Sequence, residues 1–100
     1  MKKYDGNESV EYLYDAIMAI ESKDECRAFF ETLCTTQELR SFAQRIRVAK
    51  MLHDGCVYSH IVEQTGASTA TISRVNRSIN LGENGYEAIF GRIGQSDGGL

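Results

Sequence analysis

The chain of 100 residues contains no proline and no apolar run long enough to cross a membrane. A transmembrane helix needs about 20 predominantly apolar residues, and no such stretch occurs here. The first ten residues, MKKYDGNESV, also lack the apolar segment of a secretion signal. We therefore expect a cytoplasmic protein without a membrane span. The absence of proline, with 42% hydrophobic residues, favours a compact bundle of helices.

Cysteine is scarce and is not spaced as in a metal site. Cys26, Cys34 and Cys56 form no CxxC pair, and His53 and His60 do not complete a metal-binding pattern with them. We expect no bound metal. Cys26 and Cys34 are in register with an apolar helix face, and this register favours a role as small core residues.

No group of residues has the composition of a catalytic site. Cys56 can be paired on paper with His53 or His60, but the sequence supplies neither an orienting group nor an oxyanion site for such a pair. We therefore expect no catalytic residues and no enzymatic activity.

The formal net charge of −3 hides an uneven distribution. Residues 5–38 contain nine acidic and two basic side chains, whereas residues 39–81 contain six basic and two acidic ones. A basic region beside an acidic one concentrates phosphate contacts on one part of a protein and repels nucleic acid from the other. An acidic half also keeps a protein soluble, and both explanations are open.

Apolar residues at helical spacing predict an all-α fold of six helices in a single domain at residues 1–94, followed by a flexible tail at 95–100. Two sequences of the capping-box form, Ser22 to Glu25 and Thr35 to Glu38, predict where the second and third helices begin. The predicted helices run from about Glu8 to Glu21, from Ser22 through Cys34, from Thr36 to His53, as a pair within 58–80, and from Tyr86 onward.

The third predicted helix is apolar on more than one side, and such a helix is normally enclosed by neighbours. Apolar stripes in the first, second and sixth helices add to this surface, and together they exceed what one thin core hides. Homodimerisation is the simplest explanation. A two-fold dimer also places two recognition helices in successive major grooves about 34 Å apart.

Residues 58–80, YSHIVEQTGASTATISRVNRSIN, have the pattern of a helix-turn-helix. Gly66 supplies a residue that adopts positive φ after a helix end, and Ser68 supplies a hydroxyl that caps the next helix. In the second helix Ile72, Val75 and Ile79 form one apolar stripe. The opposite face is short and polar, as a helix that approaches base pairs requires.

Two functions fit this pattern. In a DNA-binding regulator, Thr69, Ala70 and Ser73 would contact base edges, and phosphates would be contacted by Ser59, His60, Ser68, Arg74 and Arg77. Alternatively, the helix-turn-helix is a structural or protein-interaction module without DNA affinity. The scarcity of lysine and arginine between Tyr58 and Thr65 favours the second alternative, whereas the unobstructed polar face of the second helix favours the first more strongly.

Several motifs resemble the Trp repressor-like family of the YerC/YecD type. They are Thr35, the run Arg45 to Val48, Gly55, Gly66-Ala67 and the run Ala70 to Arg74. The resemblance is most specific from Thr35 to about Ser78. It implies an all-α, intertwined homodimer that represses transcription by binding double-stranded DNA at a palindromic operator.

The resemblance also implies a position for a small-molecule corepressor. In the family, tryptophan lies between the core and the recognition helices, and the matching pocket positions here are Thr35, Arg45, Arg74 and Ser78. The family's pocket has glycine directly after the second arginine and leucine in its wall, where this chain has Val75 and Cys34. Val75 either crowds an indole or belongs to the core. Arg45 and Arg74 bind either a ligand, or phosphate or a carboxylate. We predict no required cofactor, and tryptophan or another corepressor is left open.

Overall fold

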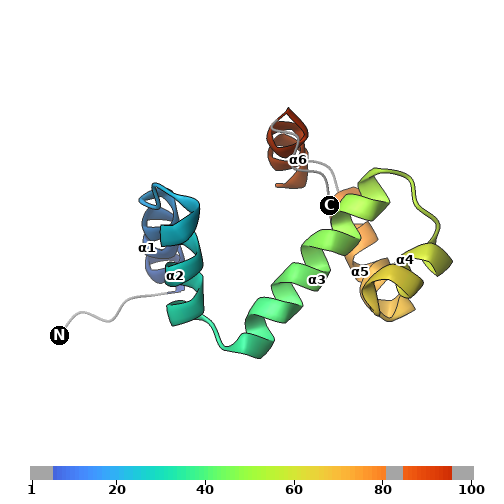
Figure 1. Ribbon diagram of the computed structural model, residues 1–100, viewed down its shortest axis with the longest axis horizontal. Helices are drawn as coiled ribbons and strands as arrows, with labels where there is room; N and C mark the ends of the chain where they lie inside the picture. Colours follow the sequence, from blue (N-terminus) through green and yellow to red (C-terminus); the bar gives the residue numbers. More distant parts are fainter. Residues whose placement is uncertain (1–5, 81–84, 96–100) are drawn as a thin grey trace. The chain divides into compact units, whose positions relative to one another are not determined.

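The computed structural model describes residues 6–80 and 85–95, which form six helices and no strand (Figure 1). The chain divides into two compact units, residues 1–39 and 40–100, with the boundary inside the third helix. The helices are α1 (Gly6–Met18), α2 (Lys23–Leu33), α3 (Thr36–His53), α4 (Tyr58–Thr65), α5 (Thr69–Asn80) and α6 (Tyr86–Gln95). Residues 96–100, where the sequence predicts a tail, lie outside the described residues.

The first helix ends earlier than its apolar pattern predicts. α1 stops at Met18 rather than continuing to Glu21: the N–H of Ala19 is shared between the carbonyls of Asp15 and Ala16, and that of Ile20 donates to Ile17, three residues back. The N–H of Glu21 then donates to the carboxylate of Glu25 at 2.9 Å. Glu21 therefore belongs to the cap of α2, and a tightened last turn closes α1.

The predicted capping box is confirmed in full at the start of α3, and its serine half is confirmed at the start of α2. Ser22 accepts a hydrogen bond from the N–H of Glu25 at 3.1 Å. At α3 the exchange is reciprocal: Thr35 Oγ1 accepts from the N–H of Glu38 at 3.0 Å, and the Glu38 carboxylate accepts from the N–H of Thr35 at 2.8 Å. Each cap satisfies backbone donors that the first helical turn leaves without a partner.

The N-terminal unit hides little of its apolar surface within one chain. Neither α1 nor α2 contains a buried residue, although Phe29 and Phe30 pack edge to face with ring centroids 5.4 Å apart. Cys26 and Cys34 are half-buried. Their role as small core residues therefore stays a prediction.

α3 ends in a glycine turn that the sequence predicts at Gly55. Gly55 has φ +83°, its N–H donates to the Leu52 carbonyl, and the N–H of Cys56 donates to the Met51 carbonyl. These two bonds make a Schellman motif, which uses the freedom of glycine at positive φ. Only the second half of α3 is enclosed, since Val48 and Ala49 are buried while Phe42 and Ile46 are exposed.

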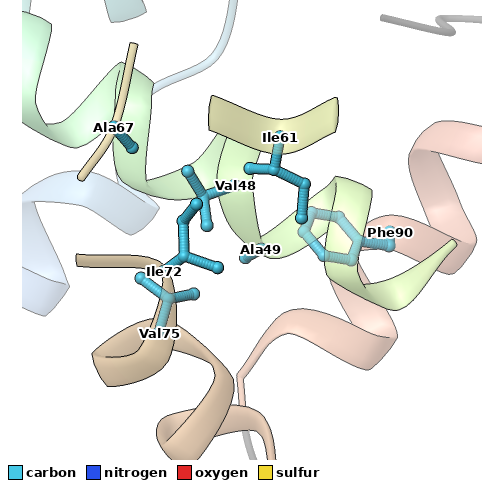
Figure 2. Packing of buried hydrophobic residues seen from close by; sticks show 7 residues of the cluster. All are labelled: Val48, Ala49, Ile61, Ala67, Ile72, Val75 and Phe90. Atoms are coloured by element: carbon cyan, nitrogen blue, oxygen red, sulfur yellow. The ribbon is translucent and has the colours of Figure 1, made fainter. Parts of the chain in front are cut away.

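The core of the C-terminal unit draws one or two side chains from each of its helices (Figure 2). The three largest fully buried side chains are Val48 from α3, Ile61 from α4 and Ile72 from α5. The remaining members are Ala49, Ala67, Val75 and Phe90. The predicted apolar stripe of α5 is thus confirmed, with Ile79 partly buried at its end. This core holds α4 and α5 against the second half of α3.

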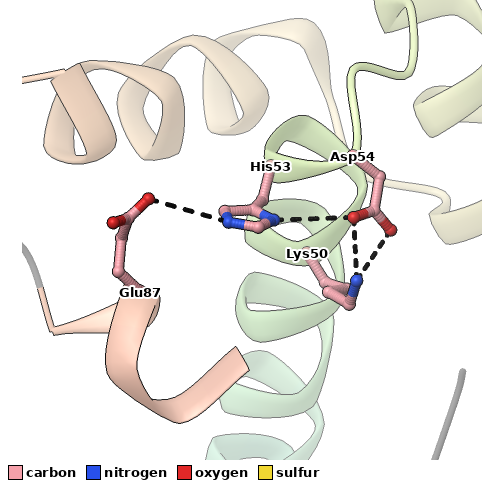
Figure 3. Close-up of polar contacts among 4 residues, drawn as sticks. All are labelled: Lys50, His53, Asp54 and Glu87. Atoms are coloured by element: carbon pink, nitrogen blue, oxygen red, sulfur yellow. Dashed lines mark hydrogen bonds and ion pairs between the residues drawn. The ribbon is translucent and has the colours of Figure 1, made fainter. Parts of the chain in front are cut away.

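The C-terminal end of α3 is also joined to α6 by polar and aromatic contacts (Figure 3). Lys50 binds Asp54 through two contacts of 2.8 Å, and His53 lies 3.5 Å from Asp54 and 3.7 Å from Glu87 of α6. The His53 ring meets Phe90 edge to face with centroids 5.5 Å apart. Hydrogen bonding to Lys50, ahead of that to His53, lowers the pKa of Asp54 below its ordinary value.

Candidate nucleic-acid interface

The two helices of the predicted helix-turn-helix are present, and a turn at Gly66 joins them. Gly66 adopts φ +71°, and its N–H donates to the Val62 carbonyl at 2.9 Å, which closes α4. The hydroxyl of Thr65 donates to the Ile61 carbonyl at 2.7 Å and accepts from the N–H of Ala67 at 3.1 Å. Ala67 is buried in the core. The turn is therefore fixed by backbone bonds on one side and by packing on the other.

Ser68 caps the start of α5 as its position in the sequence predicts. Its Oγ accepts a hydrogen bond from the N–H of Thr71 at 3.1 Å and donates to the hydroxyl of Thr71 at the same distance. The Ser68 carbonyl accepts from the N–H of Ile72 and begins the helix. α5 consequently starts at Thr69, directly after this cap.

One face of α5 is exposed along its length. Thr69, Ala70, Ser73, Arg74 and Arg77 are all exposed, whereas Ile72 and Val75 on the opposite face are buried. Each exposed position follows another by one or by three to four residues, so they form a single strip. The strip contains short side chains near the helix start and two guanidinium groups further along. This combination matches a helix whose first residues approach base edges.

The other predicted contact residues lie at the starts of the two helices. Ser59 and His60 are exposed in the first turn of α4, and Ser68 is exposed at the cap of α5. Helix starts carry unpaired backbone N–H groups and partial positive charge, and both favour phosphate. α4 itself contains no lysine or arginine. Any phosphate contact there consequently depends on hydroxyl, imidazole and backbone groups.

A glutamine that the sequence pattern did not mark joins α3 to the turn. Nε2 of Gln44 donates to the carbonyl of Thr65 at 3.1 Å, in a partly buried position. Gln44 precedes Val48 by four residues and therefore shares its face of α3. A single glutamine in a helix is normally read as a solvent-exposed residue. The sequence signal for its partly buried position was its spacing of four residues from Val48.

Val75 belongs to the core of the C-terminal unit. Its side chain is 5% exposed and packs in the cluster that contains Val48 and Ile72 (Figure 2). Of the two alternatives that the sequence leaves open for Val75, its position in the core is thus the one observed. In the single chain the side chain occupies volume beside α3 that glycine would leave empty.

The four residues that match the family's tryptophan pocket have other partners in the single chain or lie exposed. Thr35 caps α3 through its hydroxyl, and Ser78 donates to the backbone carbonyl of Arg74 at 3.2 Å. The guanidinium of Arg45 lies over the ring of Phe42, 5.5 Å from its centroid. Arg45 and Arg74 are both exposed. Their role as corepressor ligands stays a prediction.

Neither a membrane span nor a metal-ligand cluster occurs within residues 6–80 and 85–95. No helix in this part of the chain has the length and apolar content needed to cross a bilayer. The same residues contain no grouping of three or more histidine, cysteine, aspartate or glutamate side chains placed to hold a metal ion.

The whole arrangement matches one family of regulators. Residues 8–93 match the model of the Trp repressor protein family. The chain belongs to the Trp repressor family. This is a family of DNA-binding regulatory proteins rather than of enzymes, and the match covers all six helices except the ends of α1 and α6.

One curated relative and two solved structures are similar to this chain. It is 43% identical over 88 residues to YerC, an uncharacterized protein of Bacillus subtilis (strain 168), and the match covers 88% of this chain and 85% of YerC. A TrpR-like protein from Eubacterium eligens ATCC 27750 superimposes with a TM-score of 0.82 at 52% identity, over 87% of this chain and 90% of that one. A candidate Trp repressor from Staphylococcus aureus gives 0.81 at 45% identity, over 86% of each chain.

Proposed function

We propose that this protein is a sequence-specific transcriptional repressor that binds a palindromic operator as a homodimer. The observation that carries the proposal is the exposed strip of α5, which lies opposite a buried apolar stripe and directly after a glycine turn. A helix held from behind in this way presents its first turns to the major groove of DNA without obstruction.

The side chains of the strip divide into two roles by length and charge. Thr69, Ala70 and Ser73 are short and reach only groups in direct contact with the helix, so we assign them to base edges and thymine methyl groups. Arg74 and Arg77 follow further along α5, and their guanidinium groups reach phosphates, which position a protein without reading sequence. Ser59, His60 and Ser68 at the two helix starts complete the phosphate contacts.

Homodimerisation is part of the proposal because the chain exposes large apolar side chains outside the helix-turn-helix. Tyr12 and Met18 of α1, Leu33 of α2, and Phe42 and Ile46 of α3 are each more than two fifths exposed. An apolar surface of this extent normally marks an interface. A second copy of the chain covers these residues in an intertwined dimer and brings a second α5 to the same DNA duplex.

The alternative is that the helix-turn-helix mediates protein contacts without DNA. The absence of lysine and arginine from α4 favours this alternative, because phosphate binding supplies most non-specific DNA affinity. The exposed arginines of α5 and the small residues before them favour DNA more strongly. Phosphate-binding charge on α5 is misplaced for an apolar protein interface, whose centre is depleted of charge.

Selection of bound fragments from a random pool of double-stranded DNA tests the proposal. At stated salt concentrations, the protein should enrich a two-fold symmetric sequence whose half-sites lie about one helical turn apart. Adding free amino acids to parallel selections tests for a corepressor. Absence of any enriched sequence, with salt-insensitive residual binding, would favour the protein-interaction alternative.

A further inference from the structure

The carbonyl of Thr65 is one of the four that the last turn of α4 leaves without a helical partner. The glycine turn satisfies the carbonyl of Val62 through Gly66, but the carbonyl of Thr65 points toward α3 and accepts from Gln44 Nε2 at 3.1 Å. This bond joins two residues 21 positions apart, from the middle of α3 to the last residue before the turn. The hydrogen bond thereby joins Thr65, the residue directly before the turn, to α3.

The local bonds of the turn and its apolar packing set its shape, but they do not set its position along α3 by themselves. Val48, Ile61 and Ile72 hold α3, α4 and α5 together, but apolar contact has no preferred direction and tolerates small sliding movements. A hydrogen bond has a defined length and angle. Gln44 lies one helical turn before Val48 on the same face of α3. Its amide therefore fixes the position of Thr65 along the axis of α3.

The position of Thr65 determines the position of the exposed strip of α5. Only Gly66, Ala67 and Ser68 separate Thr65 from the start of α5, and each is constrained by a backbone bond, by burial or by the cap. A shift of the Thr65 carbonyl consequently moves the N-terminal turn of α5, where Thr69 and Ala70 lie. We propose that Gln44 is a positioning residue for DNA reading, whose amide holds α5 at its reading angle without a bound small molecule.

This inference rests on the proposed DNA function only for its purpose, because the positioning itself is measurable in the free protein. Two variants remove the bond. Gln44→Met keeps the length of the side chain and removes the donor, and Gln44→Asn keeps an amide that is one methylene too short. Gln37→Met and Gln37→Asn make the same changes at an exposed residue in the first turn of α3 and serve as controls.

The first measurement is the angle between α3 and α5 from residual dipolar couplings in solution, without DNA. The angle should be unchanged by added amino acids in the unaltered protein and should change or broaden in both Gln44 variants but in neither control. Variants that keep the unaltered angle would overturn the proposal. Circular dichroism checks that each variant is folded, and the Asn variant provides the result should the Met variant fail to fold.

The second measurement is the ratio of specific to non-specific DNA affinity. Loss of one hydrogen bond should lower specific affinity by about 2- to 10-fold and leave non-specific affinity unchanged, since phosphate contacts tolerate a small tilt of α5. A purely structural role would lower both affinities together, and that result would overturn the proposal. If the unaltered protein shows no specific binding while the angle still depends on Gln44, the positioning stands and the proposed function fails.

Discussion

The two units of the chain differ in how far their apolar residues are buried. Every buried residue described lies between Val48 and Phe90, in the unit at 40–100, whereas α1 and α2 of the unit at 1–39 contain none. Met18 is 82% exposed and Leu33 is 52% exposed. The C-terminal unit therefore has a core of its own, against which α5 packs. The N-terminal unit has large apolar side chains but no buried residue in α1 or α2.

The difference in burial between the two units is accompanied by a difference in charge. The acidic N-terminal region and the basic region that follows it coincide approximately with these two units. An apolar surface on an acidic unit favours contact with another copy and not with DNA. We infer that dimerisation is assigned to the N-terminal unit and the first half of α3, and DNA reading to the C-terminal unit.

The largest expected effect comes from shortening an apolar side chain of the N-terminal unit. If a second chain covers Leu33, Leu33→Ala should lower the free energy of unfolding by about 2–5 kcal/mol at each of its two copies, as core truncations do. An exposed leucine in a monomer would change it by no more than about 0.5 kcal/mol. Chemical denaturation at several protein concentrations measures the difference.

Ile72→Ala in the C-terminal unit is the matched control, because Ile72 is fully buried within one chain. It should cost about 2–5 kcal/mol as well. Light scattering distinguishes the two variants, since only Leu33→Ala should move the dimer-to-monomer midpoint to higher concentration. Equal effects on assembly from both variants would remove the proposed division of tasks.

The next effect separates anchoring from reading on α5. Arg77→Ala should weaken binding to all DNA sequences alike and lower the slope of log affinity against log salt by about 0.9 for each phosphate that Arg77 neutralises. Thr69→Val keeps the shape of the side chain and removes its hydroxyl. It should therefore change the binding free-energy difference between the preferred base and the other bases by about 1–3 kcal/mol. Uniform weakening in both variants, without a change of preferred sequence, would show that the base-reading face is misassigned.

A smaller effect concerns the contacts of Asp54 with Lys50 and His53 at the end of α3. The lowered pKa of Asp54 means that its carboxylate stabilises the fold above its ordinary pKa of 3.8, and that this contribution is lost as pH falls through the folded value below 3.8. Asp54→Asn should therefore lower the melting temperature slightly at pH 7, and the difference should shrink and then close as pH falls below 3.8. A difference that persists unchanged at low pH would indicate packing rather than charge.

The smallest expected effect is that of tryptophan on the unaltered protein, which should be none. Val75 packs in the core where the family's pocket has glycine, and we expect its side chain to take space that an indole would need. A ligand at 100 times its dissociation constant would stabilise the fold by about 2.7 kcal/mol, a rise of several degrees in melting temperature for a small domain. A clear thermal shift with tryptophan would restore Arg45 and Arg74 as corepressor ligands, and Val75→Gly provides the comparison.

Local signals predicted most of the fold. The capping residues Ser22, Thr35 and Ser68 define the starts of α2, α3 and α5, and the glycines at 55 and 66 define the ends of α3 and α4, all through bonds to neighbours within a few positions. These helix ends therefore follow from the sequence. The end of α1 was predicted three residues too late, because it depends on the bond that Glu21 makes with the following cap.

Contacts between distant residues were harder to predict. The apolar stripe of α2 correctly identified a helix, but it did not indicate that Cys26 and Cys34 would be only half-buried, since burial depends on which helices lie opposite. Gln44 was missed for the same reason: its partner is a backbone carbonyl 21 positions away, and a backbone carbonyl leaves no mark in the sequence.

The most direct test of the central claim is the mass of the protein in solution together with its thermal unfolding. Light scattering at micromolar concentration should give about twice the chain mass of 11.2 kDa. If a second chain completes the core of the N-terminal unit, dissociation and unfolding of that unit should coincide, and the melting temperature should rise with protein concentration. A monomer with full helicity and a concentration-independent melting temperature would contradict the account.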